Sequence, residues 1–358
     1  ITSFPIGPIR GGVTRVTDTL SKEFKKKGHS DYYLSIKENK KNLGKSSSFN
    51  GVEQFYMPDK NKLFSNENKD YLVNIIKEHD INIVINQSIL PKNTVDFVYE
   101  TLNNFSVLIY TVHHNCILCL NKKYIDIIKS NIDNKLAKRL VENKVFKKLL
   151  KKYNRIKYGY YFKNSIKKSK KLILLSEKFI DDLRFYVEDF DTNKVIGIQN
   201  PAPFKVENID LSKKENRIVY VGRLSVAQKR TDRLIQIWEK IFKKHPDWYL
   251  DIVGEGAERS RLESQVKSKG LKKVIFHGHQ DPRPFLRRAK LFTLTSDFEG
   301  FGMVLVEAQA YGVVPIAFNC FSAINDIIEN NNTGIIVNKF DIGEFVKALD
   351  SVMTNEEW

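Results

Sequence analysis

Short apolar runs alternate with amphipathic stretches through the second half of the chain, and this alternation constrains the fold more than any other feature. The apolar runs are 218–222, 249–254, 274–278, 291–296, 315–319 and 334–337, with helical patterns at 231–244, 257–269, 302–311 and 341–353. Apolar strands separated by helices are typical of parallel strands that are buried on both faces. The second half is therefore predicted to form a doubly wound α/β sheet, which places ligands at the carboxyl ends of its strands.

The first half repeats this alternation less regularly. A strand that ends at Pro5 is followed by a glycine-containing loop and by a helical pattern at 13–27, and the further strand candidates are 31–36, 81–87, 107–114, 172–176 and 194–200. The stretch 201–216 combines proline and charge without periodicity, so it is the predicted linker. We predict two Rossmann-like domains, 1–205 and 206–358, that face each other across a cleft and suit a reaction on a nucleotide-bound substrate.

Composition excludes several classes of protein. Of the 358 residues, 42% are hydrophobic and 28% are charged, which is ordinary for a globular protein and excludes a disordered or fibrous chain. No stretch approaches the roughly 18 unbroken apolar residues of a membrane-spanning helix. The 3 cysteines are too few for a disulfide framework and fit a reducing, cytoplasmic compartment.

The excess positive charge is concentrated in one segment. Residues 1–205 hold 37 Lys and Arg against 21 Asp and Glu, whereas residues 206–358 hold 22 against 21. Most of the excess lies in 122–171, within a basic insert at 116–171, where 18 basic side chains face only 3 acidic ones. Such a patch attracts phosphate-bearing polymers or an anionic bilayer. A lysine-rich composition that loads every solvated face is the alternative.

The window 297–308 follows the strand predicted at 291–296 and carries two glutamates. Gly300 and Gly302 allow a tight turn, after which a helix begins and offers free N–H groups to phosphate or sugar oxygens. Glu299 precedes the turn and Glu307 lies in the helix, and carboxylates accept hydrogen bonds from sugar and ribose hydroxyls. An ordinary strand–loop–helix with surface acids is the alternative.

A second window, 222–230, follows the strand predicted at 218–222. Arg223 can bind a diphosphate as a fork and Lys229 as a mobile point charge. Together they would neutralise a leaving diphosphate in place of a metal ion. Taken alone, the window could equally be a basic loop before a helix, but its partner window lies at the same sheet edge.

These paired windows resemble family 4 retaining glycosyltransferases, which have the GT-B fold. The resemblance rests on the basic pair Arg223 and Lys229 together with the pair Glu299 and Glu307. It extends to Gly11-Gly12 before a helix, Thr111-Val112-His113 at a strand end, Gln199-Asn200-Pro201 and Val253-Gly254-Glu255-Gly256. It covers nearly the whole chain and is specific in 218–340.

The resemblance implies a role for each matched residue. Arg223 and Lys229 bind the donor diphosphate, Glu307 the ribose hydroxyls, and Glu299 the transferred sugar, to which His113 also lies near. The other implied donor contacts come from the loops: Gly12, Gly254 and the backbone N–H groups of Phe301, Gly302 and Met303. Arg223, Lys229, Glu299 and His113 form the implied catalytic set, with no metal ligand and no cofactor.

The implied activity is that of a metal-independent hexosyltransferase that retains the anomeric configuration. It moves a sugar from a nucleoside diphosphate, expected to be UDP rather than GDP, to a carbohydrate or lipid-linked acceptor hydroxyl in bacterial surface polysaccharide or glycolipid assembly. A nucleotide-sugar epimerase of the same fold is the main alternative, and a phosphorylase is disfavoured by chain length. A non-enzymatic basic binding module is disfavoured by the near-neutral second half.

Aromatic and basic side chains alternate in 151–171. The aromatic residues that lie among the lysines are Tyr153, Tyr158, Tyr160, Tyr161 and Phe162. Apolar residues at helical spacing run from Leu136 up to Tyr153. This pattern favours an anionic membrane surface over nucleic acid, with a solvated face as the remaining alternative. We therefore expect a cytoplasmic protein, peripheral on the inner face of the cell membrane, and no nucleic-acid partner.

Two shorter patterns indicate metal or redox chemistry only weakly. Cys116 and Cys119 could form a redox pair or, with His113 and His114, a zinc site, but two packed thiols are the favoured interpretation. Asp189-Phe190-Asp191 matches a metal-binding Asp-x-Asp pattern, yet its acidic surroundings favour a solvated loop.

Overall fold

We describe a computed structural model of residues 1–358, except for 8–10, 38–42, 88–93, 121–142, 203–207 and 356–358. The described residues form two compact units: the first comprises the described residues up to 202 and the second those from 208 onward. Leu136, where the apolar residues at helical spacing were predicted to begin, lies outside the described residues.

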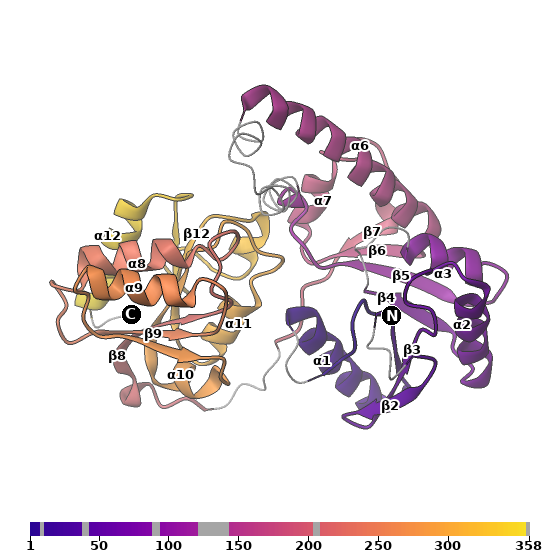
Figure 1. Ribbon diagram of the computed structural model, residues 1–358, viewed down its shortest axis with the longest axis horizontal. Coiled ribbons are helices and arrows are strands. Elements are labelled where there is room, and N and C mark those ends of the chain that lie inside the picture. The colour runs from indigo at the N-terminus through magenta and orange to yellow at the C-terminus, as the bar shows by residue number, and fades with distance from the viewer. Residues whose placement is uncertain (8–10, 38–42, 88–93, 121–142, 203–207, 356–358) are drawn as a thin grey trace. The chain divides into compact units, whose positions relative to one another are not determined.

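The first unit contains two sheets (Figure 1). Its strands are β1 (Tyr32–Ser35), β2 (Ser46–Phe49), β3 (Val52–Tyr56), β4 (Ile83–Asn86), β5 (Leu108–His113), β6 (Lys171–Leu174) and β7 (Val195–Gly197). Its helices are α1 (Gly12–Lys26), α2 (Asn66–Glu78), α3 (Thr94–Leu102), α6 (Lys144–Lys168) and α7 (Lys178–Leu183), with the 3-10 turn η1 (Thr192–Lys194). Strands β4, β5, β6 and β7 pair in parallel in that order.

The smaller sheet has the order β1-β3-β2, with β1 parallel and β2 antiparallel to β3. Strands β2 and β3 had no sequence prediction. The strand predicted at 1–5 is reduced to an isolated bridge between Thr2 and Ser35. This segment still connects the two sheets, because the Gln87 N–H donates to the Ile1 carbonyl at 2.8 Å and the Thr2 N–H donates to the Leu34 carbonyl at 2.9 Å.

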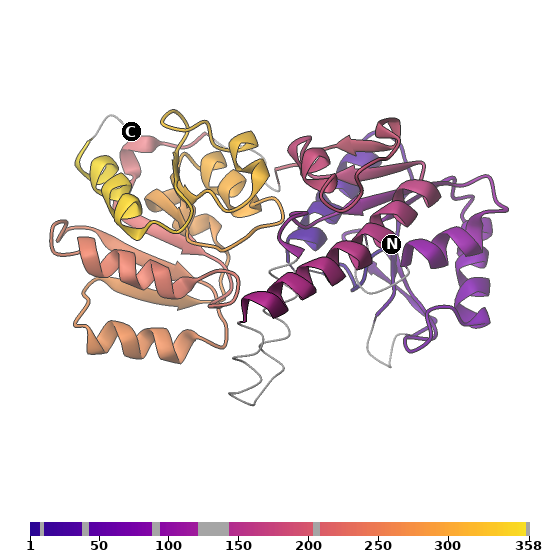
Figure 2. The ribbon, with the colours of Figure 1, turned by 90° about the horizontal axis from the view of Figure 1, so that it is seen from above.

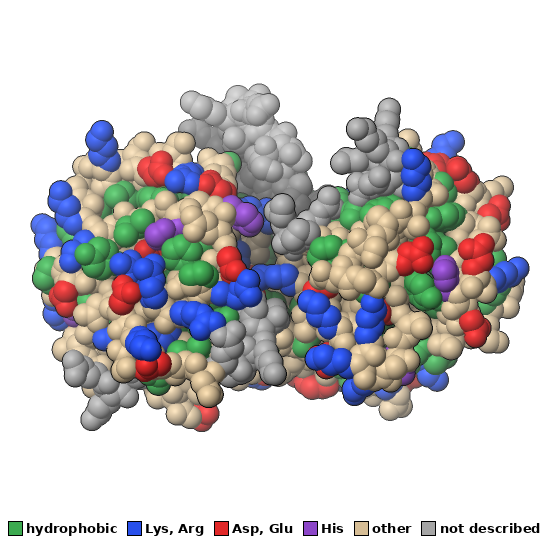
Figure 3. Space-filling view, turned by 90° about the horizontal axis from the view of Figure 1, so that it is seen from below, with side chains coloured by type: hydrophobic (Ala, Val, Ile, Leu, Met, Phe, Trp, Pro, Cys, Tyr) green, Lys and Arg blue, Asp and Glu red, His purple; other side chains and the backbone are tan. Residues whose placement is uncertain are grey.

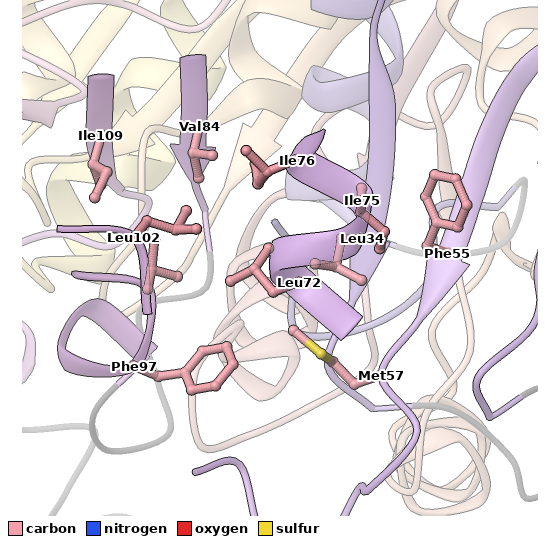
Figure 4. Close-up of a cluster of buried hydrophobic side chains, with 11 residues drawn as sticks. Leu34, Phe55, Met57, Leu72, Ile75, Ile76, Val84, Phe97, Leu102 and Ile109 are labelled. Carbon is pink, nitrogen blue, oxygen red and sulfur yellow. The ribbon is translucent and has the colours of Figure 1, made fainter. Parts of the chain in front are cut away.

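One hydrophobic core cluster holds helices α2 and α3 against these sheets (Figure 4). Helix α2 contributes Leu72, Ile75 and Ile76, and the strands contribute Leu34, Phe55, Val84 and Ile109. Each of these side chains is at least nine-tenths buried. Removing that much apolar surface from water is the main favourable term in folding, so this cluster explains why the helices adopt their places on the sheets.

The second unit is a six-stranded parallel sheet with helices on both faces (Figures 1 and 2). Its strands are β8 (Glu215–Val221), β9 (Tyr249–Val253), β10 (Val274–Gly278), β11 (Ala289–Leu294), β12 (Val314–Phe318) and β13 (Ile335–Val337). Its helices are α8 (Thr231–Ile241), α9 (Arg259–Ser268), α10 (Arg283–Arg288), α11 (Met303–Ala310) and α12 (Ile342–Thr354), with 3-10 turns η2 (Leu211–Lys213) and η3 (Ser322–Asp326).

The strand order in this sheet is β10-β9-β8-β11-β12-β13. Helix α8 packs beside α9 and α12, whereas α10 and α11 pack on β8, β11 and β12. The chain thus winds outward from β8 in one direction and from β11 in the other, which places the intervening helices on opposite faces. The strands and helices predicted for the second half are confirmed. The predicted linker 201–216 also contains η2 and the start of β8.

Candidate functional site

The carboxyl ends of β8 and β11 are neighbours in the middle of the second sheet. The strand order reverses between these two strands, and open α/β sheets bind their ligands at such a point. The loop after β8 carries 222–230 and the loop after β11 carries 295–302. The structure therefore brings the two sequence-predicted windows together.

Hydrogen bonds join these two loops directly. The Asp297 N–H donates to the Gln228 carbonyl at 2.8 Å, and the Thr295 hydroxyl donates to the Lys229 carbonyl at 3.1 Å. In return, the Gln228 side-chain amide donates to the Phe298 carbonyl at 3.3 Å. Because the contacts run in both directions, the positions of the two loops are coupled.

Lys229 lies within this junction rather than in open solvent. Its Nζ is 2.7 Å from Glu299 Oε1, and only 16% of its side chain is exposed. The Ser296 hydroxyl donates to the same carboxylate oxygen at 2.5 Å. The side chain that was expected to act as a mobile point charge is thus held in place by its pairing with Glu299. An incoming diphosphate would share Lys229 with this carboxylate.

Arg223 is exposed, and its backbone carbonyl is held by Tyr220. The Tyr220 hydroxyl donates to the Arg223 carbonyl at 3.1 Å, although the Tyr220 side chain is almost fully buried. Burial, and then the charge of Glu299, raises the pKa of Tyr220 well above 10. The hydroxyl therefore remains protonated and able to donate. Sequence inspection missed Tyr220, whose only signal is a polar atom within an apolar strand.

The loop after β9 approaches the loop after β8 so closely that only glycine fits. Gly254 has a φ of +146°, and a Cβ atom there would lie 1.9 Å from the Gly222 carbonyl oxygen. The Leu224 N–H donates to the Glu255 carbonyl at 2.9 Å, which continues the contact. Gly254 therefore shapes the Arg223 loop, a role that the sequence pattern alone did not specify.

Helix α11 begins at this junction with Gly302 as its N-cap, at a φ of +75°. The first N–H groups of a helix have no partner within it, so the turn through Phe301, Gly302 and Met303 offers donors for an anion. Phe301 and Glu307 are buried, the latter with 1% exposure. The predicted contact of Glu307 with ribose stays a prediction.

An ion-pair network that sequence inspection missed lies beneath the junction. Arg233 Nη1 contacts Asp297 Oδ1 at 2.6 Å, and the Arg233 guanidinium lies 3.9 Å from the Phe340 ring centroid. Arg230 binds Asp232 through two hydrogen bonds of 2.9 and 2.8 Å. Burial alone would raise the pKa of Asp232, but Arg230, with Arg233, lowers it below its usual value. The network anchors the start of the Glu299 loop.

The remaining predicted site residues, Gly12 and His113, lie in the first unit. Gly12 is the first residue of α1 and is exposed, and a Cβ atom added there would have no atom within 4 Å. His113 ends β5, is buried, and has its ring 5.1 Å from the Phe162 ring. Near it, Gln87 Oε1 lies 3.0 Å from His114 Nε2 and accepts a bond from the Thr17 hydroxyl at 3.1 Å. Burial lowers the pKa of His114 to about 4, so its ring is neutral.

The weaker sequence patterns show no metal-binding arrangement among the described residues. Cys116 and Cys119 are joined in a disulfide, so the expectation of two packed thiols is wrong: the short loop after β5 brings the sulfurs within bonding distance. Asp189 and Asp191 are exposed, and Asp191 caps the turn η1. In the part of the chain that the structure describes, no cluster of three His, Cys, Asp or Glu side chains could hold a metal ion.

A cavity of about 570 Å³ lies elsewhere in the first unit, bordered by α1, β1, α2 and β4. None of the predicted site residues lines it. None of the described helices has the length and hydrophobicity to cross a membrane.

Comparisons with known proteins find a matching family model and solved structures of the same fold. Residues 203–358 match the family model described as glycosyl transferases group 1. The apo structure of WaaB, a lipopolysaccharide outer core galactosyltransferase, superposes with a TM-score of 0.65 at 18% identity, over 99% of this chain and 89% of that one. WaaG, a glycosyltransferase involved in lipopolysaccharide biosynthesis, superposes with a TM-score of 0.62 at 16% identity, over 98% and 89%. The fold is GT-B.

Curated relatives share sequence over about half of the chain. An uncharacterized glycosyltransferase of Haemophilus influenzae is 32% identical over 190 residues, which is 52% of each chain. An amylovoran biosynthesis glycosyltransferase of Erwinia amylovora is 29% identical over 197 residues, 53% of this chain and 54% of that protein. The chain thus spans about half the length of the curated relatives that it matches.

Proposed function

We propose that the chain is a glycosyltransferase that moves a sugar from a nucleoside diphosphate to an acceptor hydroxyl with retention at the anomeric carbon. The observation that carries the proposal is the junction at the sheet reversal, where the loop with Arg223 and Lys229 meets the loop that leads into α11. Two cations on one loop, next to the loop that begins a helix, suit a diphosphate. The family match over 203–358 supports the same conclusion.

In the proposed reaction, the bond between the anomeric carbon and the diphosphate oxygen breaks while the acceptor oxygen bonds to the same face. Arg223, Lys229 and the α11 N–H groups stabilise the negative charge that develops on the leaving diphosphate. The acceptor proton passes to the leaving phosphate oxygen, so no protein base is needed. These cations take the place of a metal ion, and we propose no cofactor.

For the remaining site residues we propose the roles that the family resemblance implies. Glu307, in α11, would bind the ribose hydroxyls, and Glu299 would contact the transferred sugar once the donor competes for Lys229. We assign the donor to residues 206–358 and the acceptor to residues 1–205, with His113 and Gly12 at the acceptor and sugar side.

Relatives support the choice of donor and acceptor classes. S. aureus TarM was solved with UDP, and this chain superposes on it with a TM-score of 0.58 at 20% identity over 81% of this chain and 52% of that one. A Campylobacter jejuni relative, 28% identical over 177 residues (49% of each chain), is an N-acetyl-D-galactosaminyltransferase named for an undecaprenol-linked acceptor. We propose UDP as the nucleotide and a bacterial surface polysaccharide or glycolipid as the product, made on the cytoplasmic side of the membrane.

The test combines nucleotide binding with substitutions in the junction. UDP should raise the melting temperature of the wild type more than GDP does, because a ligand that binds only the folded state stabilises it. With a competent donor and acceptor, Arg223→Ala and Lys229→Ala should each lower turnover by roughly two to three orders of magnitude. Lys213→Ala, at an 81% exposed lysine of the same unit, is the control and should leave turnover unchanged.

Three results would contradict the proposal. If both Arg223→Ala and Lys229→Ala retained wild-type turnover, these two residues would not bind the donor diphosphate. Release of free nucleotide without any acceptor would favour the epimerase alternative, which no comparison supports. Loss of activity in a chelator would show that a divalent ion is required.

A further inference from the structure

Helix α6, labelled in Figure 1, carries two apolar faces according to the burial of its side chains. One face packs on the first unit through Tyr158, Phe162 and Ile166, which are buried. The other face remains in solvent and carries five large apolar or aromatic side chains, which we call the α6 stripe. Their exposed fractions are 67% for Val145, 60% for Leu149, 53% for Tyr153, 67% for Ile156 and 66% for Tyr160.

The α6 stripe is a continuous line along the helix. Successive members are three or four residues apart, so at about 100° per residue they fall within an arc of roughly 80°. Tyr158 and Phe162 fall roughly opposite the middle of that arc. The exposed side chains are therefore not the outer edge of the buried face but a second face with its own direction.

The charge of α6 has one sign only. The helix contains ten Lys and Arg residues and no Asp or Glu. By its helical position, Lys152 flanks the α6 stripe on one side and Lys157 on the other, and the Lys157 Nζ lies 5.8 Å from the Tyr153 ring centroid. By contrast, the face drawn in Figure 3 shows acidic and basic side chains interspersed.

These features select an anionic bilayer surface as the partner. Contiguous exposed apolar residues mark an interaction site, and a line of lysines beside aliphatic and tyrosine side chains is typical of helices that lie in a membrane interface. A second copy of α6 would place lysines against lysines, which disfavours self-association. Anionic headgroups pair with the lysines of α6, and the boundary between headgroups and acyl chains buries its apolar side chains.

We propose that α6 binds the protein to an anionic membrane by inserting the α6 stripe between lipid headgroups. An enzyme with a lipid-linked acceptor is expected to associate with the membrane, and the α6 stripe is the surface for that contact. In that respect the inference rests on the proposed function. Binding to lipid requires no nucleotide and no catalysis, so the two can be tested separately.

The experiment measures co-sedimentation of the full chain with two kinds of vesicle: equal parts phosphatidylglycerol and phosphatidylcholine, or phosphatidylcholine alone. The stripe variant is Leu149→Ser with Ile156→Ser, which retains every charge. Its matched control is Leu211→Ser with Ile198→Ser, at side chains 63% and 48% exposed and outside α6. A charge variant, Lys148→Gln with Lys152→Gln, keeps the stripe.

Wild type and control should bind the anionic vesicles equally, and the stripe variant should bind roughly tenfold more weakly or worse, because two aliphatic side chains no longer enter the interface. The charge variant should also bind more weakly, most clearly at low salt. The UDP-induced rise in melting temperature should be the same in all four proteins. That readout separates loss of lipid binding from failure of the proposed function.

Equal binding by the stripe variant and the wild type would overturn the proposal and leave only a diffuse electrostatic attraction. A wild type that is dimeric in light scattering, with a monomeric stripe variant, would assign the α6 stripe to a second copy instead. Equal recovery with both kinds of vesicle, or no binding at low salt, would also overturn it.

Discussion

The Asp251 carboxylate joins three neighbouring strands of the second sheet. It lies on β9 and is 1% exposed, and it accepts two hydrogen bonds from Arg217 Nη1 on β8, at 3.1 and 2.9 Å. His277 Nε2, on β10, lies 2.7 Å away. A buried charge is costly unless it is paired, so removing one partner of this cluster should lower the free energy of unfolding strongly.

We expect Asp251→Ala to lower the free energy of unfolding by about 3 to 5 kcal/mol, because it leaves the Arg217 charge without its buried partner. Asp281→Ala is the control. Asp281 binds Arg283 at the surface, with both side chains about half exposed, and its loss should cost less than about 1 kcal/mol. Urea denaturation of the two variants measures the difference, and similar midpoints would show that Asp251 contributes little.

At the scale of elements, three loops at the carboxyl ends of β8, β9 and β10 fit together through backbone atoms. The Gly222 N–H donates to the Val253 carbonyl at 3.0 Å, and the Gly254 N–H donates to the Gly278 carbonyl at 2.7 Å. Because backbone meets backbone here, the shape of the Arg223 loop depends on glycine in the neighbouring loop.

Gly254→Ala should therefore disturb both stability and nucleotide binding. The added Cβ would lie 1.9 Å from the Gly222 oxygen, and the φ of +146° is itself unfavourable for alanine. We expect a loss of more than about 3 kcal/mol in unfolding free energy, or a clear reduction of the UDP-induced melting shift. Gly270→Ala is the matched control, since its φ is +62° but no atom lies within 4 Å of the added Cβ, and it should cost about 1 kcal/mol.

At the scale of the whole molecule, carboxylates with lowered pKa values make stability depend on pH. Hydrogen bonds from Lys244, and then from His245, lower the pKa of Asp350, which connects the end of α8 to α12. A carboxylate whose pKa is lower in the folded state stabilises the fold above its unfolded pKa of about 4. This stability is lost as the pH falls through the folded pKa.

We expect the wild type to be most stable above about pH 5 and to lose stability between about pH 4 and pH 2. Asp350→Asn should be less stable at neutral pH and should lose less on acidification, because one of the linked groups is gone. Asp70→Asn, at an exposed carboxylate of α2, is the control and should follow the wild type. Urea midpoints across this pH range provide the test, and parallel curves for Asp350→Asn and the wild type would contradict it.

The sequence by itself determined the strands of the second unit and every one of its helices except α10, and that the windows around Arg223 and Glu299 follow strands. Both conclusions rest on local patterns: buried parallel strands are apolar throughout, and amphipathic helices repeat every 3.6 residues. The short strand β2 escaped prediction because Ser46–Phe49 has no apolar alternation and pairs only with β3.

Only the tertiary structure decided which residues meet. Strand order depends on pairing between segments distant in sequence: β8 and β11 pair across 67 intervening residues, and this adjacency places Lys229 against Glu299 and Arg233 against Asp297. The tertiary structure likewise decided that Lys229 is held by a carboxylate and that the α6 stripe stays exposed while Phe162 is buried. The physical reason is that periodicity reports which face of an element is apolar, whereas the partner of that face is set by packing among all the elements at once.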